Sequence, residues 1–65
     1  MNEFQHTEAI ESLIQEGRRE EAVERHNLHV EQTFTRARAG ERINLTDLIA
    51  AKQILVESAE RLPPS

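Results

Sequence analysis

His26 and His29 are the residues whose types and spacing come closest to a chemical site. Two histidines three positions apart lie on adjacent parts of one helix surface, where they can share a metal ion. His6, on the preceding predicted helix, could supply a further ligand. A zinc site normally needs three or four ligands with supporting hydrogen bonds. The spacing therefore makes His6, His26 and His29 candidates for a metal-responsive module, although His26 also falls on an apolar face that suits a buried, neutral imidazole.

No other motif predicts catalysis. Gly17 and Gly40 are too far apart to form a phosphate-binding loop. Ser12, Ser58 and Ser65 have no histidine and acid close by in the sequence that would activate a nucleophile. The carboxylates fall on faces that we predict to be exposed, and so short a chain leaves little room for a substrate pocket. We therefore expect a protein that is not an enzyme and that uses no cofactor.

Lys52 lies in the middle of the most apolar stripe of the chain. At about 100° per residue, seven apolar residues share its helix face: Leu45, Leu48, Ile49, Leu55, Val56, Ala59 and Leu62. A lone ammonium group there needs an acidic partner, a path to water along its own stem, or a second chain. The stripe predicts a dimer or partner interface, and its contact residues would be Leu48, Lys52, Leu55, Val56 and Ala59.

The apolar periods predict three helices, over residues of about 3–16, 19–39 and 45–62. Gly17 and Gly40 stand just past the first two, where glycine commonly ends a helix. Asn44 predicts the N-cap of the third helix, and Pro63 and Pro64 predict its end. We expect a single all-α domain over residues 1–65. Its first two helices would form an antiparallel hairpin, and the third would complete either a three-helix arrangement or a longer hairpin.

Leu28 and Ile54 fall on sides of their predicted helices that face away from the main apolar stripes. One exposed leucine is ordinary. Three such residues, of which Phe4 is the third, beside a third helix that is apolar on two sides, indicate a second buried surface. A chain of 65 residues can bury only a thin core by itself. These features favour a homodimer; a hetero-partner and a bare monomer are the alternatives.

The composition narrows the function further. Cysteine is absent, which fits a reducing compartment, and no segment predicts a membrane span or a signal peptide. We therefore expect a cytoplasmic protein. The net charge of −4 disfavours a nucleic-acid binder. The charge is uneven, because residues 1–32 hold eight acids and three bases whereas residues 33–65 hold four acids and five bases.

Arg36, Arg38 and Arg42 cluster around the predicted turn between the second and third helices. They allow an alternative function, in which the chain is a DNA-associated regulatory protein with a helix-turn-helix. A recognition helix should carry polar and basic residues near its start, whereas this third helix begins Leu45-Thr46-Asp47. The arginines suit the carboxyl end of the second helix better, because cations there favour the helix dipole, and they could also bind the acidic half of another subunit.

One stretch resembles the closing helical hairpin of the effector-binding domain in GntR-type regulators. The matching residues are Thr7-Glu8-Ala9-Ile10, Leu13-Ile14, Gly17, Glu21-Ala22 and His29. In that family the hairpin carries histidines that bind metal or ligand, and here Thr7 stands where the first of them is expected. The resemblance covers this stretch alone, and the same spacing suits other helical hairpins, including tetratricopeptide-like ones.

The sequence therefore predicts a small, non-enzymatic protein–protein interaction module: a regulator, adaptor, inhibitor or co-chaperone. It would bind itself and an unidentified larger protein through an apolar helical surface. A DNA-associated regulator and a histidine-based metal-responsive module remain as alternatives.

Overall fold

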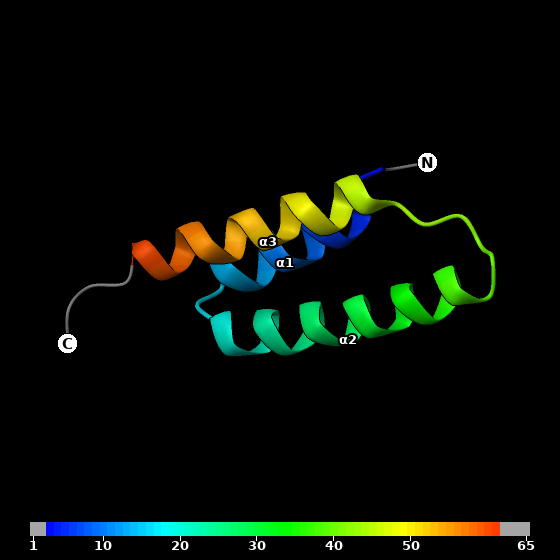
Figure 1. Cartoon of the computed structure of the whole chain (residues 1–65). Helices are drawn as coiled ribbons and strands as arrows, with labels where there is room; N and C mark the ends of the chain where they lie inside the picture. Colours follow the sequence, from blue (N-terminus) through cyan, green and yellow to red (C-terminus); the bar gives the residue numbers. More distant parts are fainter. Residues whose placement is uncertain (1–2, 62–65) are drawn as a thin grey trace.

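The computed structural model describes residues 3–61 and contains, over that range, three helices and no strand. Helix α1 covers Gln5–Gln15, α2 covers Arg19–Arg38 and α3 covers Leu45–Glu60. α1 and α2 form an antiparallel hairpin, and α3 returns alongside α1 in the same direction (Figure 1). α1 packs against both other helices, and α2 and α3 touch each other least. The prediction of an all-α chain is confirmed, and of its two possible arrangements the structure has the three-helix one.

The two glycines end α1 and α2 as predicted. Gly17 has a φ of 78° and Gly40 a φ of 86°, the left-handed region that side chains with a Cβ disfavour. At the first turn, the Gly17 amide donates to the carbonyl of Ile14 at 3.0 Å and the Arg18 amide to that of Leu13 at 2.8 Å. These bonds satisfy carbonyls that the end of α1 would otherwise leave unpaired.

The predicted cap of α3 is also confirmed. The Asn44 side chain accepts a hydrogen bond from the Asp47 amide at 3.1 Å and donates one to the Glu3 carbonyl at 2.7 Å. Asn44 therefore ties the start of α3 to the start of α1. The prolines predicted to end the third helix, Pro63 and Pro64, lie outside the described residues, as does Leu62.

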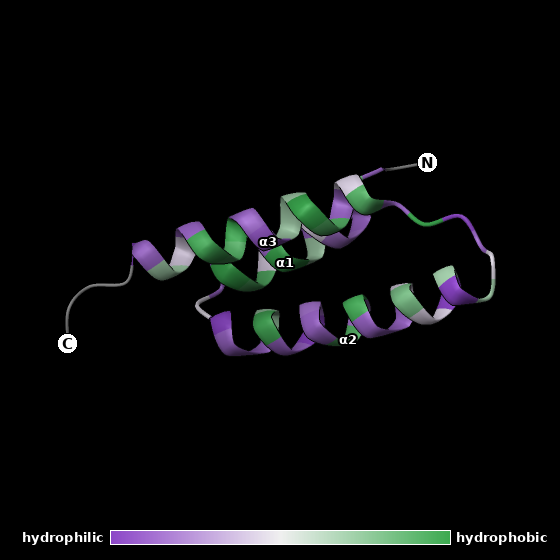
Figure 2. Ribbon diagram, viewed as in Figure 1, coloured by the Kyte–Doolittle hydropathy of each residue, from purple (hydrophilic) through white to green (hydrophobic). Residues whose placement is uncertain are grey.

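The core is small and lies between α1 and the inner sides of the other two helices. Its buried members are Ile10, Leu13, Ala22, Ala51 and Leu55, with Ile14, Val23 and Ile54 packed against them. α3 is hydrophobic around much of its circumference, whereas α2 is mostly hydrophilic (Figure 2). Among the described helices, none has the length and apolar character needed to cross a membrane.

Candidate interaction surface

The apolar stripe of α3 divides between the core and the surface. Leu48 and Leu55 are buried inside the chain itself, with 8% and 7% of their surface exposed. Lys52, Val56 and Ala59 are exposed. On a helical wheel, the two leucines lie toward one edge of the stripe, so the chain's own core reaches them and leaves the rest uncovered. Leu48 and Leu55 therefore already have an intramolecular role, and the exposed part alone remains available to a partner.

We call the exposed part the α3 seam; it consists of Leu45, Ile49, Lys52, Val56 and Ala59. These positions follow one another at intervals of four, three, four and three, the spacing with which helices pack in coiled coils. Leu45 is 53% exposed, Ile49 58% and Val56 50%. The side of α3 that meets α1 carries Asp47 and Ile54, roughly 180° around the helix. The seam therefore faces away from α1.

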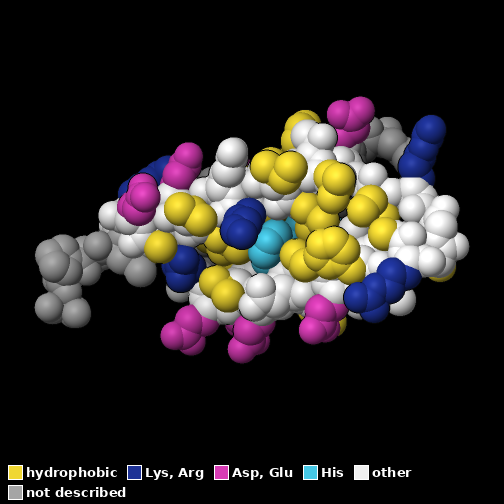
Figure 3. Space-filling model, viewed as in Figure 1, with side chains coloured by type: hydrophobic (Ala, Val, Ile, Leu, Met, Phe, Trp, Pro, Cys, Tyr) yellow, Lys and Arg dark blue, Asp and Glu magenta, His cyan; other side chains and the backbone are white. Residues whose placement is uncertain are grey.

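On the helical wheel of α2, Val23, Val30 and Phe34 share one side, which we call the α2 flank. Both valines are half-buried, and Phe34 is 52% exposed. Figure 3 shows hydrophobic side chains gathered over α3 and α2, around a histidine and a basic side chain. Phe34 is uncovered for a geometric reason: α1 has 11 residues and α2 has 20. At about 1.5 Å per residue, α1 is too short to reach along the last turns of α2.

Lys52 is exposed and makes no ion pair with any residue between 3 and 61. Its positive charge is one of the causes that lower the pKa of His26, after burial of the imidazole and the charge of His29. Lys52 on α3 is therefore near enough to His26 on α2 for its charge to act on the imidazole. An open groove runs along the outer side of α3 from this point, lined by Ile49, Lys52, Gln53, Val56, Glu57 and Glu60.

Leu28 and Ile54, the residues predicted to form a second surface, lie in different surroundings. Leu28 is 55% exposed and lies beside Ala9 and His29, on the side where α2 meets α1. Ile54 is half-buried and packs against the core. The structure does not bring the two together. Ile54 lies on the side of α3 opposite the apolar stripe, and α1 covers that side.

The three histidines, from α1 and α2, do come together. His6 Nε2 and His26 Nδ1 share a hydrogen bond of 3.0 Å, and the His6 and His29 rings stack with centroids 3.9 Å apart. Burial, followed by the charges of His29 and His26, lowers the pKa of His6 to about 4. Stacked rings do not direct their nitrogens at a common point. In residues 3–61 no group of three or more histidine, cysteine or acidic side chains is placed to hold a metal ion.

Asp47 joins α1 to α3 at their amino ends. Its carboxylate accepts hydrogen bonds from the amides of His6 at 3.0 Å and Thr7 at 2.8 Å, and from the Thr7 hydroxyl. Burial alone would raise the pKa of Asp47, but the hydrogen bonds from Thr7 and His6 outweigh it and hold that pKa below its usual value. Asp47 therefore caps α1 from another helix, where an anion favours the helix dipole. The sequence identified it only as an acid in the first turn of α3.

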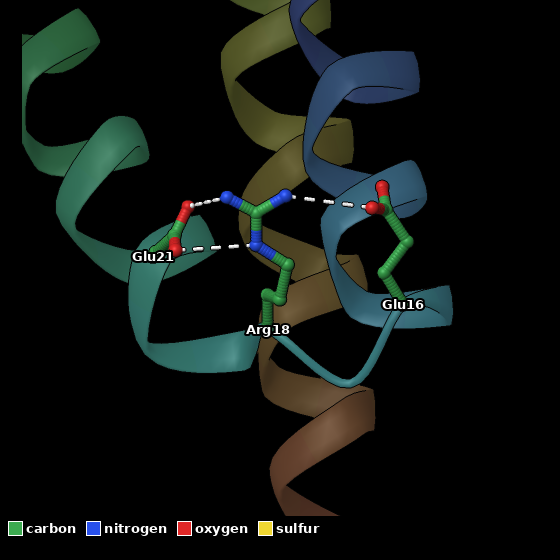
Figure 4. Close-up of polar contacts among 3 residues, drawn as sticks. All are labelled: Glu16, Arg18 and Glu21. Atoms are coloured by element: carbon green, nitrogen blue, oxygen red, sulfur yellow. Dashed lines mark hydrogen bonds and ion pairs between the residues drawn. The ribbon is translucent and has the colours of Figure 1, made fainter.

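The arginines proposed for nucleic acid, Arg36, Arg38 and Arg42, are exposed at the carboxyl end of α2 and in the loop that follows. The start of α3, which a helix-turn-helix would place on DNA, holds α1 through Asp47. At the opposite end of the molecule, Arg18 pairs with Glu21 at 2.5 Å and with Glu16 at 3.4 Å (Figure 4).

Searches of protein-family models, curated proteins and solved structures found no match to this chain.

Proposed function

We propose that the chain is a small, non-enzymatic protein–protein interaction module that forms a homodimer through the α3 seam and the α2 flank. The observation that carries the proposal is the coiled-coil spacing of the exposed apolar residues on α3. Scattered apolar residues are normal on a protein surface. A row with this spacing, apolar at every position except Lys52, on a helix whose other side is already packed, matches the pattern of a helix that contacts two neighbours.

The size of the exposed face supports the same function. The four large apolar residues on it are Phe34, Leu45, Ile49 and Val56, each about half exposed. Exposed patches of large apolar residues on a monomer often have a function. A standard interface buries about 800 Å² on each partner. The patch would therefore form the apolar centre of such an interface, and polar residues around it would form the rim.

The test is the mass of the protein in solution, followed by light scattering over a dilution series, with helicity measured in parallel. We expect a dimer at high concentration that dissociates on dilution. Ile49→Asp should raise the dissociation constant about a hundredfold or more, because dimerisation would bury an unpaired carboxylate. The helicity of this variant should stay unchanged at low concentration, since Ile49 lies outside the core.

Leu28→Asp is the matched control. Leu28 is 55% exposed and Ile49 58%, and both lie on helices, but Leu28 is on the side of α2 near α1. This variant should dimerise like the parent chain. Leu55→Asp is unsuitable as a probe, because Leu55 belongs to the core and an aspartate there would unfold the chain. A monomer at every concentration, or equal effects of the Ile49 and Leu28 variants, would contradict the proposal.

A mobility-shift assay at low and moderate salt tests the DNA-associated alternative, in which Arg36, Arg38 and Arg42 would contact phosphates. Phosphate contacts weaken steeply as salt rises. We expect no shift even at low salt. A shift that falls with salt and is lost when the three arginines are replaced by glutamine would replace the interaction module with a nucleic-acid binder.

A further inference from the structure

We infer that the two copies of the chain pair their α3 helices in antiparallel orientation, with Lys52 of each copy bound to Glu60 of the other. The inference rests on the proposed function, because it specifies the partner, the orientation and the ionic contacts of the same surface. Three features of α3 carry it: two charges without a partner, a groove with opposite charges at its ends, and the direction in which lysine side chains lean.

The first feature is a pair of unmatched charges. Lys52 and Glu60 are both exposed, and within residues 3–61 neither makes an ion pair. The neighbouring acid Glu57 already has a partner in Arg61 at 3.2 Å. Lys52 and Glu60 are eight positions apart, which is about 12 Å along a helix, too far for a salt bridge within one chain. Each can be neutralised by the other only across two molecules.

The second feature is the groove on the outer side of α3. Ile49 and Val56 are its apolar residues, Lys52 lies toward its amino end, and Glu57 and Glu60 lie at its carboxyl end. Figure 3 shows acidic side chains toward the carboxyl end of α3, beyond the apolar patch. Two copies related by a two-fold axis across α3 would place the positive end of each groove against the negative end of the other. A surface with this property is complementary to itself, as a two-fold interface requires.

The third feature fixes the orientation. A helical side chain leans toward the amino end of its own helix, so the Lys52 stem extends toward the level of Ile49. In an antiparallel pair with Ile49 against Ala59 of the partner subunit, Lys52 lies against the partner's Val56. The ammonium group then extends toward the partner's Glu60. A parallel pair in register would instead bring the two Lys52 residues together, without an acid at that level.

Cross-linking tests the orientation, and the chain suits it because it contains no cysteine of its own. An equimolar mixture of the Ile49→Cys and Ala59→Cys variants should form an interchain disulfide on mild oxidation. Either variant alone should not. In the antiparallel pair, identical sites are about 15 Å apart along the axis, whereas a disulfide needs Cα atoms within about 7 Å. A parallel pair gives the reverse result, with disulfides in each single variant and none between the two.

Charge exchange tests the ionic pair. Lys52→Glu places two acids together, and Glu60→Lys places two lysines together, so each should weaken its own homodimer about three- to tenfold. A mixture of the two variants should form a heterodimer with the parent affinity, since both inter-subunit pairs are then opposite in charge. The double variant should recover as well. Glu24→Lys is the matched control: Glu24 is exposed on α2 one turn before Leu28, makes no ion pair among the described residues, and its replacement changes the net charge as much as Glu60→Lys does.

The outcomes separate this inference from the proposed function. A chain that stays monomeric at all concentrations overturns both. A dimer that Ile49→Asp disrupts, but that cross-links only in the single-cysteine variants, keeps the interaction module and overturns the antiparallel pairing. Mixing without recovery of affinity overturns the pairing of Lys52 with the partner's Glu60. Cross-linking in the mixture together with recovery by charge exchange supports the full arrangement.

Discussion

The amino ends of α1 and α3 bury polar side chains, whereas the outer side of α3 exposes apolar ones. This is the reverse of what these residue types usually do. His6, Thr7 and Asp47 are buried at these two amino ends, and His26 and Thr33 of α2 are buried as well, each with 7% or 8% of its surface exposed. The large apolar residues of the α3 seam are about half exposed. The polar cluster tolerates burial because no buried side-chain nitrogen or oxygen atom among the described residues lacks a hydrogen-bond partner. The seam stays exposed because, within residues 3–61, no other helix covers it.

The sharpest way to break the buried polar region is Asp47→Ala. This change removes the acceptor for two buried amides and a hydroxyl, from His6 and Thr7. It also removes the cap of α1. We expect the free energy of unfolding to fall by about 3–5 kcal/mol, which is much of what a small domain has. Urea unfolding followed by circular dichroism measures the loss.

Asp47→Asn is the control for that variant. The asparagine side chain has the same shape and keeps one oxygen acceptor, but it has no charge. The Asp47→Asn variant should therefore lose much less free energy of unfolding than Asp47→Ala. An alanine variant as stable as the parent would show that the carboxylate is not the effective cap of α1.

Ile10 and Ile49 compare the core with the seam through the same residue type. Ile10 is fully buried and Ile49 is 58% exposed. Ile10→Ala should cost about 2–4 kcal/mol, because it leaves a cavity that the short helices cannot close. Ile49→Ala should change the stability of the dilute monomer by less than about 1 kcal/mol. Its effect should appear in the dissociation constant instead. Equal losses in the monomer would mean that Ile49 also belongs to the intramolecular core.

The buried histidines predict a loss of stability in mild acid. The pKa of His6 falls from 6.5 to about 4 in the folded chain, and the pKa of His26 is lowered too. Below pH 6.5 the unfolded chain binds protons that the folded chain does not, so stability falls until the pH reaches about 4. For His6 the total is on the order of 3 kcal/mol. The lowered pKa of Asp47 adds a further loss below its ordinary value of 3.8.

Urea midpoints between pH 7.5 and 4.5 test this dependence, at a concentration where the chain is monomeric. His6→Gln should be less stable at pH 7.5, because the hydrogen bond to His26 and the stacking on His29 are lost. Its stability should also fall less steeply with acid. A slope equal to that of the parent would assign the titration to other groups.

Features set by a few neighbouring residues were predictable from the sequence. The left-handed glycines, the Asn44 cap and the three helices all follow from local rules. The starts of α2 and α3 fall where predicted, and the other helix ends differ by one or two residues. The division of the apolar stripe was not predictable, because a helical wheel gives an angle but not the position of the neighbouring helix. Neither was the role of Asp47 at the start of α1, since it depends on a contact 40 residues away.

Two neighbouring arginines compare a partly buried contact with an exposed one. Their substitutions should give the smallest difference in the free energy of unfolding. Arg19 donates to the Ser58 hydroxyl at 2.8 Å and to the Leu55 carbonyl at 3.0 Å, and so joins α2 to α3. Arg18 pairs only with exposed acids of its own turn. Arg19→Met should lower the free energy of unfolding by about 1–2 kcal/mol, because it leaves a partly buried carbonyl without its charged donor.

Arg18→Met should leave the urea midpoint unchanged within error, even though its ion pair with Glu21 is the shorter contact. An exposed ion pair contributes little to stability, because water solvates both charged groups when they are apart and the pair restricts two long side chains. Salt separates the two contacts further: the effect of the Arg19 substitution should persist at high ionic strength, because its partners are a hydroxyl and a carbonyl rather than a charge. A larger loss of stability in the Arg18 variant would contradict this prediction. It would mean that the exposed ion pairs in the turn between α1 and α2 contribute more to the free energy of unfolding than the hydrogen bonds of Arg19 to α3.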